Sequence, residues 1–417
     1  MSAAYVIGAY STAFGRFAER SFRDLTREAV LGVLGDAGLD GGEAIESLWF
    51  GNVLMDFWGQ HSTRGQFCVV PLEEEGILPR RIPVMNVEGG CATGSMALHG
   101  AAKDILSGTA DVALAVGVEK TYRTDVPREQ TMAMFRAGEN ALNPEETLRE
   151  YERLAELTGR PLEFGPDRTM FMDTYAAQAS YHMDRFGTTQ RQIAAAAAKN
   201  HTNGAANPLA QYRFAMTIDE VLADREVSYP LTRSMCAPIG DGAGAALVCS
   251  ERALARLPQA VRDRAVRVAG AVLRSGIYRQ PDEPSLSRVA ADRAYELAGV
   301  GPDDIDVAEV HDATAFGEIY QAEMLRFCEV GSGGPFVAGG ATALDGRIPL
   351  NTSGGLLSKG HPIAASGLSM IHEIVMQLRG EAGERQVPGA RLGLVENGGG
   401  IMGLEEAACC VTILDHR

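Results

Sequence analysis

The sequence predicts an α/β protein built from two similar halves with a helical insertion between them. Apolar runs typical of buried strands, at 112–116, 245–248 and 392–395, alternate with stretches typical of helices, and this alternation indicates layers of helices on sheets. Glycine supplies 48 of the 417 residues, and its clusters mark places where the backbone turns tightly or approaches a ligand. Two pairs of segments also repeat along the chain, which indicates an internal duplication.

The first pair of repeats is a helix that ends at a glycine and leads into a strand. After a first strand near the N-terminus, a helix ends within residues 36–40 (DAGLD) and a strand begins at 45–48 (IESL). In the second half, residues 297–301 (LAGVG) precede 305–309 (IDVAE) in the same way. A glycine directly after a helix adopts the left-handed conformation that ends it. We therefore expect one such helix–turn–strand unit in each half.

The second pair of repeats is a glycine-containing turn that opens a helix. Residues 90–96 (GCATGSM) begin a predicted helix that ends at Gly108 and precedes a strand. Residues 361–367 (HPIAASG) begin another that ends at Gly380 and also precedes a strand. Proline suits the first turn of a helix, where no N–H is required. Each half thus supplies one turn at a helix N-terminus.

Residues 121–230 differ in composition from the halves on either side. They are rich in Arg, Glu, Met and aromatic residues, with helical spacing at 145–157 and an alanine run at 194–198. We expect a mostly helical insertion. Its composition is equally consistent with a structural spacer and with a cap over the substrate. The predicted domains are an N-terminal half of residues 1–120 and 231–255, the insertion at 121–230 and a C-terminal half at 256–417.

Composition and charge exclude several classes of protein. Lys and Arg number 38 and Asp and Glu 54, giving a net charge of −16 without a basic block, so broad nucleic-acid binding is not expected. No apolar run approaches the roughly 18 residues of a membrane span, and the first residues lack the features of a signal peptide. The seven cysteines form no C-x-x-C pair, which argues against a disulfide framework or a metal site. We expect a cytoplasmic protein without a membrane partner or a metal.

Cys91 is the first candidate for chemistry, because it lies where a glycine-rich turn enters a predicted helix. Free N–H groups and a partial positive charge at a helix N-terminus favour thiolate over thiol. The same N–H groups can hold a developing oxyanion. A lone cysteine is more often a small buried residue, but the two glycines before Cys91 and the small residues after it favour a nucleophile.

Two histidines are placed to serve such a thiol. His361 lies in KGHP (359–362), at the equivalent turn of the second half, and an imidazole with its ordinary pKa of about 6.5 can take a proton from a thiol. His311 follows an apparent strand at 307–310, and strand ends face the ligand crevice in α/β folds. Asp312 could orient the His311 ring, although neighbouring residues of a strand point to opposite faces. The thiol and the histidines can meet only if the two halves face each other.

Several stretches, taken in order, resemble the thiolase superfamily along essentially the whole chain. They are NVEGGCATG (86–94), CAPIGDGAGA (236–245), the His-Asp pair at 311–312 and the stretch from NTSGG to GHP (351–362). The closest likeness is to the sterol-carrier-protein-type and archaeal-type branch, which carries His-Asp where biosynthetic thiolases have Asn-Glu. Residues 199–208 (KNHTNGAANP) also recur in this branch.

The resemblance implies the thiolase fold, a five-layered αβαβα core of two duplicated halves with a helical loop insertion. It also implies an acyl-CoA substrate, coenzyme A as co-substrate without a covalently bound cofactor, and a homodimer or dimer of dimers. By position, Cys91 is similar to the acyl-accepting nucleophile and His361 to the histidine that activates it. His311 corresponds to the group that helps hold the thioester oxygen of the enolate. Gly398 matches the glycine whose N–H, with that of Cys91, forms a second oxyanion hole.

One part of the thiolase pattern is absent, namely the second reactive cysteine that serves the carbon next to the thioester. Thiolases carry it in a Cys-x-Gly turn near the C-terminus or two residues after the His of His-Asp-Cys-Phe. Here these places hold Glu396 and Ala313, and Cys409 and Cys410 lie too far along the final strand to replace it. The acid could be Glu396, His361 acting twice or a residue of a partner chain. We favour Glu396, on its position alone.

The resemblance predicts a thiolase-type acyltransferase that cleaves a 3-oxoacyl-CoA with CoA, or runs the reverse Claisen condensation, through an acyl-Cys91 intermediate. A ketoacyl-synthase-like decarboxylating condensing enzyme is one alternative, because such enzymes use one Cys with two His and need no second cysteine. A retro-aldolase on a thiolase fold is another, although such chains dispense with the nucleophilic cysteine. A small zinc-ribbon/OB-fold protein is an expected partner, since thiolases of this branch are often encoded with one.

Overall fold

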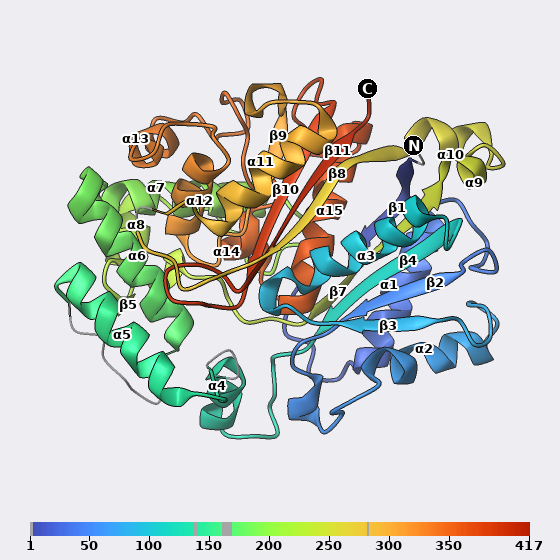
Figure 1. The fold of residues 1–417 in the computed structure, drawn as a ribbon, viewed down its shortest axis with the longest axis horizontal. Helices are drawn as coiled ribbons and strands as arrows, with labels where there is room; N and C mark the ends of the chain where they lie inside the picture. Colours follow the sequence, from blue (N-terminus) through green and yellow to red (C-terminus); the bar gives the residue numbers. More distant parts are fainter. Residues whose placement is uncertain (1–2, 137–139, 161–168, 282) are drawn as a thin grey trace.

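The structure of the protein is a computed structural model that describes residues 3–136, 140–160, 169–281 and 283–417. Two α/β halves form the core, and a group of helices from the middle of the chain lies beside them (Figure 1). Within the described residues, no helix combines the length and the apolar character needed to cross a membrane.

The N-terminal half is an α/β unit whose strands lie in the order β3–β2–β4–β7–β1. β2 is parallel to β3 and β4, and β7 is antiparallel to β4 and β1. α3 ends at Gly108, whose φ of +76° is left-handed, as predicted. The elements of this half are β1 (Ala4–Ser11), α1 (Phe22–Asp36), β2 (Ser47–Gly51), a 3₁₀ turn (Met55–Trp58), α2 (Arg64–Glu74), β3 (Val84–Val87), a 3₁₀ turn (Gly90–Ala92), α3 (Thr93–Ser107), β4 (Val112–Glu119) and β7 (Gly242–Ser250).

The C-terminal half repeats this topology, which confirms the predicted duplication. Its strands lie in the order β8–β11–β10–β9, and Leu350 forms a parallel bridge to Ala308 of β9, where the counterpart of β3 would lie. The predicted ends of α11 at Gly299 and of α15 at Gly380 are confirmed. The strands of this half are β8 (Val266–Ser275), β9 (Val307–Glu309), β10 (Leu392–Gly399) and β11 (Ala408–Asp415).

Short and long helices connect these strands. They are α9 (Glu251–Leu254), α10 (Gln259–Arg264), α11 (Leu286–Ala298), α12 (Ala315–Met324), α13 (Gly333–Ala338), α14 (Gly355–Lys359) and α15 (Ile363–Arg379), with 3₁₀ turns at Pro302–Asp304 and Gly383–Arg385. The first two lie between β7 and β8 and so link the halves. The last helix, α15, takes the place in this half that α3 takes in the first.

The two halves stack as five layers, and the expected αβαβα core is confirmed. α3 and α15 form the central layer, where one continuous apolar core joins them to the inner faces of both half-sheets. α1 and α2 cover the outer face of the first half-sheet, and α11 and α12 cover the outer face of the second. The half-sheets also join edge to edge, because β1 pairs with β8 at Tyr5–Arg267 and Val6–Val266.

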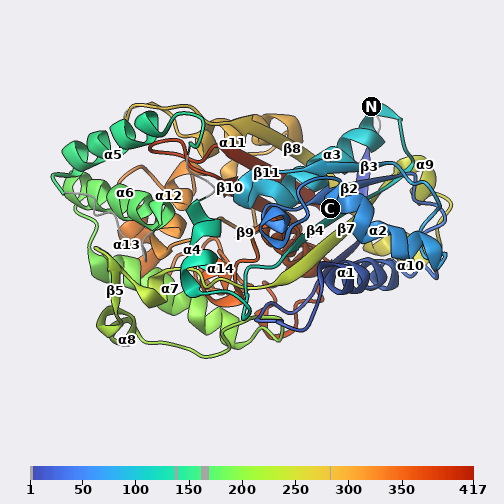
Figure 2. The ribbon, with the colours of Figure 1, turned by 90° about the horizontal axis from the view of Figure 1, so that it is seen from below.

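The middle of the chain is mostly helical, as its composition predicts. Figures 1 and 2 show α6 and α7 of this segment, in green, beside α12 of the C-terminal half, and Figure 1 shows α4, in teal, further from it. α7 packs against α12, α13 and α14, so it reaches the loops at the strand ends of that half. The elements are α4 (Arg128–Arg136), α5 (Pro144–Thr158), α6 (Met170–Phe186), α7 (Gln190–Ala205), α8 (Ile218–Ala223), the hairpin of β5 (Glu226–Ser228) and β6 (Leu231–Thr232), and a 3₁₀ turn (Arg233–Met235).

A partly buried ion pair ties the two halves together where α1 and α15 end. The Oδ2 atom of Asp36 accepts hydrogen bonds from Arg379 at 2.8 Å and from the N–H of Ala9 at 2.8 Å, and Oδ1 accepts from Arg264 at 2.7 Å. Burial acts to raise the pKa of Asp36, but the charge of Arg379 and the N–H of Ala9 lower it by more. The pKa of Asp36 therefore lies below its ordinary value. The ionised carboxylate stabilises the fold at pH values above that ordinary pKa, and this stabilisation is lost as the pH falls.

We predict that Asp36→Asn lowers the free energy of unfolding at pH 7 by about 3 kcal/mol, because it leaves a buried arginine unpaired. The difference from wild type should shrink as the pH falls below about 4, since protonation removes the same interaction from the wild type. Chemical denaturation at pH 7 and pH 3 measures both effects. Glu381→Gln is the matched control, since Glu381 binds Arg264 at the half-exposed surface. An equal loss in the two variants would contradict the prediction.

Candidate active site

The thiol of Cys91 and the imidazole of His361 lie in hydrogen-bond contact across the boundary between the halves. Cys91 occupies the 3₁₀ turn that precedes α3, and His361 immediately precedes Pro362 and α15. The Sγ atom of Cys91 lies 3.1 Å from Nε2 of His361. Two residues that are 270 positions apart in the sequence are thus brought together by the N-termini of the two central helices.

Close backbone approach of two glycine turns holds the Cys91 turn in place. Gly90 has a left-handed φ of +56°, and a Cβ there would lie 2.5 Å from the backbone nitrogen of Gly400. A Cβ on Gly399 would lie 2.3 Å from the nitrogen of Ala92. Neither position has room for a side chain. The end of β10 therefore packs directly on the turn that carries Cys91.

Ser366 fixes the tautomer of His361. Its hydroxyl donates to the carbonyl of Pro362 at 3.0 Å and lies 2.8 Å from Nδ1 of His361. A hydroxyl has one proton to donate, so towards Nδ1 it can only accept. His361 consequently carries its proton on Nδ1, and the lone pair of Nε2 faces the Cys91 sulfur. The sequence analysis missed Ser366, although its place one helical turn after Pro362 is the available signal.

Burial keeps this pair uncharged before substrate binds. It raises the pKa of the Cys91 thiol to about 12. The charge of Glu406 raises this pKa further, whereas the N–H groups of Gly400 and Cys91 lower it. Burial also lowers the pKa of His361 to about 3, with a further contribution from His311. Loss of solvent therefore opposes the thiolate more than the N–H groups at the helix N-terminus favour it. Proton transfer must then accompany attack on the substrate.

His311 lies beside His361, with its ring atoms free for a ligand. The two ring centroids are 5.6 Å apart, and both ring nitrogens of His311 are buried without a hydrogen-bond partner among the described residues. Burial lowers the pKa of His311 to about 4, so the neutral ring can donate one N–H. One donor atom each from Cys91, His311 and His361 lie within 4.8 Å of one another. Such a set could also ligate a soft divalent cation, and the expected absence of a metal stays a prediction.

Asp312 does not orient the His311 ring, which agrees with the argument that neighbouring strand residues point to opposite faces. Its carboxylate accepts hydrogen bonds from the amide of Asn200 at 2.7 Å and from the N–H of Leu356 at 2.7 Å. The side chains of His311 and Asp312 point in different directions, as expected for neighbours at the end of a strand. Asp312 instead connects the loop after β9 to α7 and α14.

Glu396 lies on the outer face of β10, the face turned towards α11. Its carboxylate accepts hydrogen bonds from the N–H of His311 at 3.0 Å, from Ser287 at 3.3 Å and from Cys409 at 3.3 Å. Burial raises the pKa of Glu396 to about 8. Neither Cys91 nor His361 is among its partners. These contacts hold the His311 loop in place.

Gly398 lies two residues further along the same face of β10. It pairs with Cys409 of β11, and a Cβ there would meet the side chain of Glu406. The backbone N–H groups that act on the Cys91 sulfur are those of Gly400 and of Cys91 itself. The oxyanion role inferred for Gly398 stays a prediction, and the sequence analysis did not single out Gly400.

Residues of α7 and its following turn brace both histidine-bearing loops. Asn200 binds Asp312, Asn203 donates to the carbonyl of Asn351 at 3.0 Å, and Asn207 donates to the carbonyl of Ser353 at 2.8 Å. These residues belong to the motif at 199–208 that the sequence analysis noted without assigning its contacts. The motif therefore joins the insertion to the loops that carry His311 and His361.

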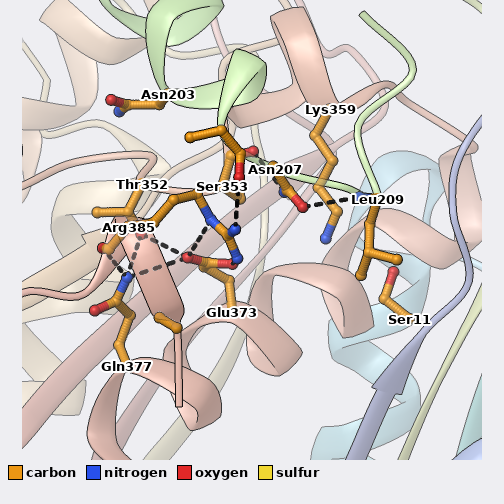
Figure 3. A network of polar contacts seen from close by, with 12 residues as sticks. Ser11, Asn203, Asn207, Leu209, Thr352, Ser353, Lys359, Glu373, Gln377 and Arg385 are labelled. Carbon is orange, nitrogen blue, oxygen red and sulfur yellow. Dashed lines mark hydrogen bonds and ion pairs between the residues drawn. The ribbon is translucent and has the colours of Figure 1, made fainter. Parts of the chain in front are cut away.

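A buried polar network lies beneath the loop that leads to His361 (Figure 3). Glu373 of α15 accepts hydrogen bonds from Thr352 at 3.0 Å and from Arg385 at 2.9 Å. Ser353 donates to Glu309 of β9 at 2.6 Å. Because each carboxylate is held by several donors, the loop is fixed from below and cannot shift without leaving buried charges unpaired.

A cavity of about 590 Å³ opens onto Cys91. It lies between the Cys91 turn, the loop after β2, the hairpin after β10, α4 and the start of α6. Its apolar wall includes Phe57, Met134, Phe135, Phe171, Ile363 and Ile401. Such a wall can bury an acyl group and exclude water from the thiol.

Known proteins are similar to this chain along most of its length. Residues 4–222 match the family model "Thiolase, N-terminal domain", and residues 279–414 match "Thiolase C-terminal domain-like". The chain is 36% identical over 403 residues to an acetyl-CoA acetyltransferase of Methanothermobacter thermautotrophicus, covering 95% of this chain and 96% of that one. It is 32% identical to sterol carrier protein 2 of Bos taurus, covering 97% of this chain and 73% of that one.

A solved Ltp2-ChsH2(DUF35) aldolase shares the fold, with a TM-score of 0.77 and 24% identity, covering 99% of this chain and 97% of that one. The chain belongs to the thiolase family. Within that family it is an enzyme of the thiolase-type acyltransferase class.

We predict that Ser366→Ala lowers kcat by roughly tenfold to a hundredfold with little change in KM, because His361 then loses the acceptor that fixes its tautomer. Ser366→Thr retains the hydroxyl and should restore most of the activity. Steady-state kinetics of both variants, with thermal unfolding as a control, provide the measurement. If the alanine and threonine variants lose kcat equally, the side chain matters for packing and the tautomer assignment is wrong.

Proposed function

We propose that the protein catalyses CoA-dependent cleavage of a 3-oxoacyl-CoA, or the reverse Claisen condensation, through an acyl group carried on Cys91. The observation that carries this proposal is the 3.1 Å contact between Sγ of Cys91 and Nε2 of His361. A neutral thiol beside an unprotonated imidazole nitrogen is the arrangement needed to form a thiolate during attack. The chain is similar to an acetyl-CoA acetyltransferase over nearly its whole length, which supports the reaction class.

In the proposed first half-reaction, His361 takes the proton of Cys91 as the sulfur attacks the 3-oxo carbon of the substrate. The bond between carbons 2 and 3 then breaks, leaving an acyl-Cys91 and the enolate of the shorter acyl-CoA. His311 holds the enolate oxygen through a ring N–H, which its unpartnered nitrogens support. The N–H of Cys91, together with that of a glycine of β10 or its turn, holds the oxygen on the acyl-cysteine side.

In the second half-reaction, the thiol of coenzyme A attacks the acyl-Cys91, and His361 returns its proton to the departing sulfur. Coenzyme A acts as a co-substrate. The apolar cavity beside Cys91 suits an apolar acyl chain larger than acetyl, since it offers aromatic and aliphatic surface on several sides. Acyl transfer to a thiol also separates this proposal from a retro-aldolase, which requires no acyl-accepting cysteine.

The proposal extends to the setting in which the enzyme works. We infer a homodimer or a dimer of dimers in the cytoplasm, where seven unpaired cysteines would remain reduced. A small zinc-ribbon/OB-fold partner is part of the proposal, and its support is that Ltp2 in the similar structure is joined by ChsH2(DUF35).

Incubation with a panel of 3-oxoacyl-CoAs and free CoA tests the proposal, with the two acyl-CoA products separated by chromatography. We expect cleavage by the wild type and a loss of at least about 10³-fold in Cys91→Ser, since a serine hydroxyl is a far weaker nucleophile beside a neutral histidine. Cys68→Ser is a control at another buried cysteine, one of α2. Full turnover by Cys91→Ser would contradict the proposal, and so would condensation of acyl-CoA with a malonyl thioester in place of cleavage.

A further inference from the structure

The proposed reaction needs a proton donor that the thiolase-like pattern does not supply in this chain. When the bond between carbons 2 and 3 breaks, carbon 2 must receive a proton, and His361 already holds the proton of Cys91. His311 serves the enolate oxygen. Neither position at which thiolases carry a second cysteine has one here, since they hold Glu396 and Ala313.

Three carboxyl groups near Cys91 are already engaged in holding backbone. Glu396 holds the N–H of His311. Glu119 accepts the N–H groups of Val53 at 3.1 Å and Leu54 at 3.2 Å. Glu88 is exposed and accepts the N–H of Gly90 at 2.7 Å. A proton donor that releases its proton to substrate in each cycle needs a carboxyl oxygen that does not hold the backbone of a neighbouring loop.

Glu406 holds the backbone N–H of no other residue among those that the structure describes; the one backbone N–H that acts on its carboxyl group is its own. It lies in the turn between β10 and β11, is 8% exposed and forms no ion pair with the residues that the structure describes. A Cβ on Gly398 would lie 2.7 Å from Cγ of Glu406 and 3.0 Å from its Oε1. The carboxyl group therefore fills the space above the α-carbon of Gly398, beside the turn that packs on Cys91. This also explains why position 398 is a glycine.

The electrostatics agree with this placement. After burial, the charge of Glu406 is the largest influence that raises the pKa of the Cys91 thiol. The charge of Glu406 is also the largest influence, after burial, that raises the pKa of the Tyr175 hydroxyl. Burial raises the pKa of Glu406 itself to about 7, so both its protonated and ionised forms are accessible at neutral pH. A general acid and base works best when its pKa lies near the operating pH.

We propose that Glu406 is the catalytic acid and base for carbon 2 of the acyl-CoA, in the role that a second cysteine has in other thiolases. This inference rests on the proposed function. In cleavage, protonated Glu406 gives its proton to carbon 2 as the bond between carbons 2 and 3 breaks, leaving Glu406 ionised and His361 protonated. Glu406 then takes the proton of the CoA thiol as that sulfur attacks the acyl-Cys91. His361 returns its proton to Cys91, and all three groups regain their starting state.

Hydrogen exchange at carbon 2 tests the proposal directly. The wild type in D₂O should replace the carbon 2 hydrogens of acetyl-CoA by deuterium, as followed by NMR. In Glu406→Gln this exchange should fall by at least about 100-fold, the size of a general acid–base contribution. Glu405→Gln is the matched control, since Glu405 is the neighbouring carboxylate but is occupied by the N–H groups of Ile277 and Leu286 and by Arg279. It should retain the exchange.

A second measurement separates this inference from the proposed function. Acylation of Cys91 by p-nitrophenyl acetate needs no acid, because the leaving group departs as an anion, so Glu406→Gln should acylate within about threefold of the wild type. Exchange at the wild-type rate in Glu406→Gln overturns the proposal, and so does loss of exchange in Glu396→Gln but not in Glu406→Gln. Failure of the wild type to acylate Cys91 overturns the proposed function, and this inference with it.

Discussion

The contact between two glycine turns is the constraint on which the rest of the site depends. Gly90 and Gly399 lie so close to the opposing backbone that neither has room for a Cβ, and their approach fixes the turn of Cys91 against the end of β10. Gly94 of α3 and Gly367 of α15 also lie too close to the backbone of the opposite helix to carry a Cβ, so the two helices start side by side and Cys91 and His361 face each other at 3.1 Å. The duplicated fold makes this arrangement natural, since equivalent helix N-termini of the two halves point into one shared space.

Burial then decides the chemistry of the groups that meet there. Desolvation keeps the thiol and both histidines uncharged at rest, so the reactive form of Cys91 arises only as a substrate accepts the charge. The surrounding carboxyl groups divide into two kinds. Glu119 and Glu396 hold the backbone of loops at the site, and networks beneath the loop of His361 hold Glu309 and Glu373. Glu406 holds no other residue among those that the structure describes. For this reason we assign it the role of acid and base for carbon 2.

Much of this arrangement could be predicted from the sequence, because periodicity, helix-ending glycines and the repeated turns are local signals. They located the strands at 112–116 and 392–395, the ends of α3 and α15, and the candidate residues Cys91, His361 and His311. Contacts between distant residues left no such signal. Asn200 meets Asp312 only because the insertion packs on the C-terminal half, and Glu406 lies beside Gly398 only because of the path of the turn after β10. The sequence also could not show where the Glu396 side chain points, because the face of β10 on which it lies depends on strand register.

Mass spectrometry of the Cys91 peptide, after rapid acid quench of the enzyme turning over a 3-oxoacyl-CoA, tests the central claim most directly. The account predicts an acyl adduct on Cys91 whose mass follows the acyl chain supplied, and its near absence in His361→Asn, where no base takes the thiol proton. An enzyme that turns over without any adduct on Cys91, or that carries the acyl group on another residue, would contradict the account.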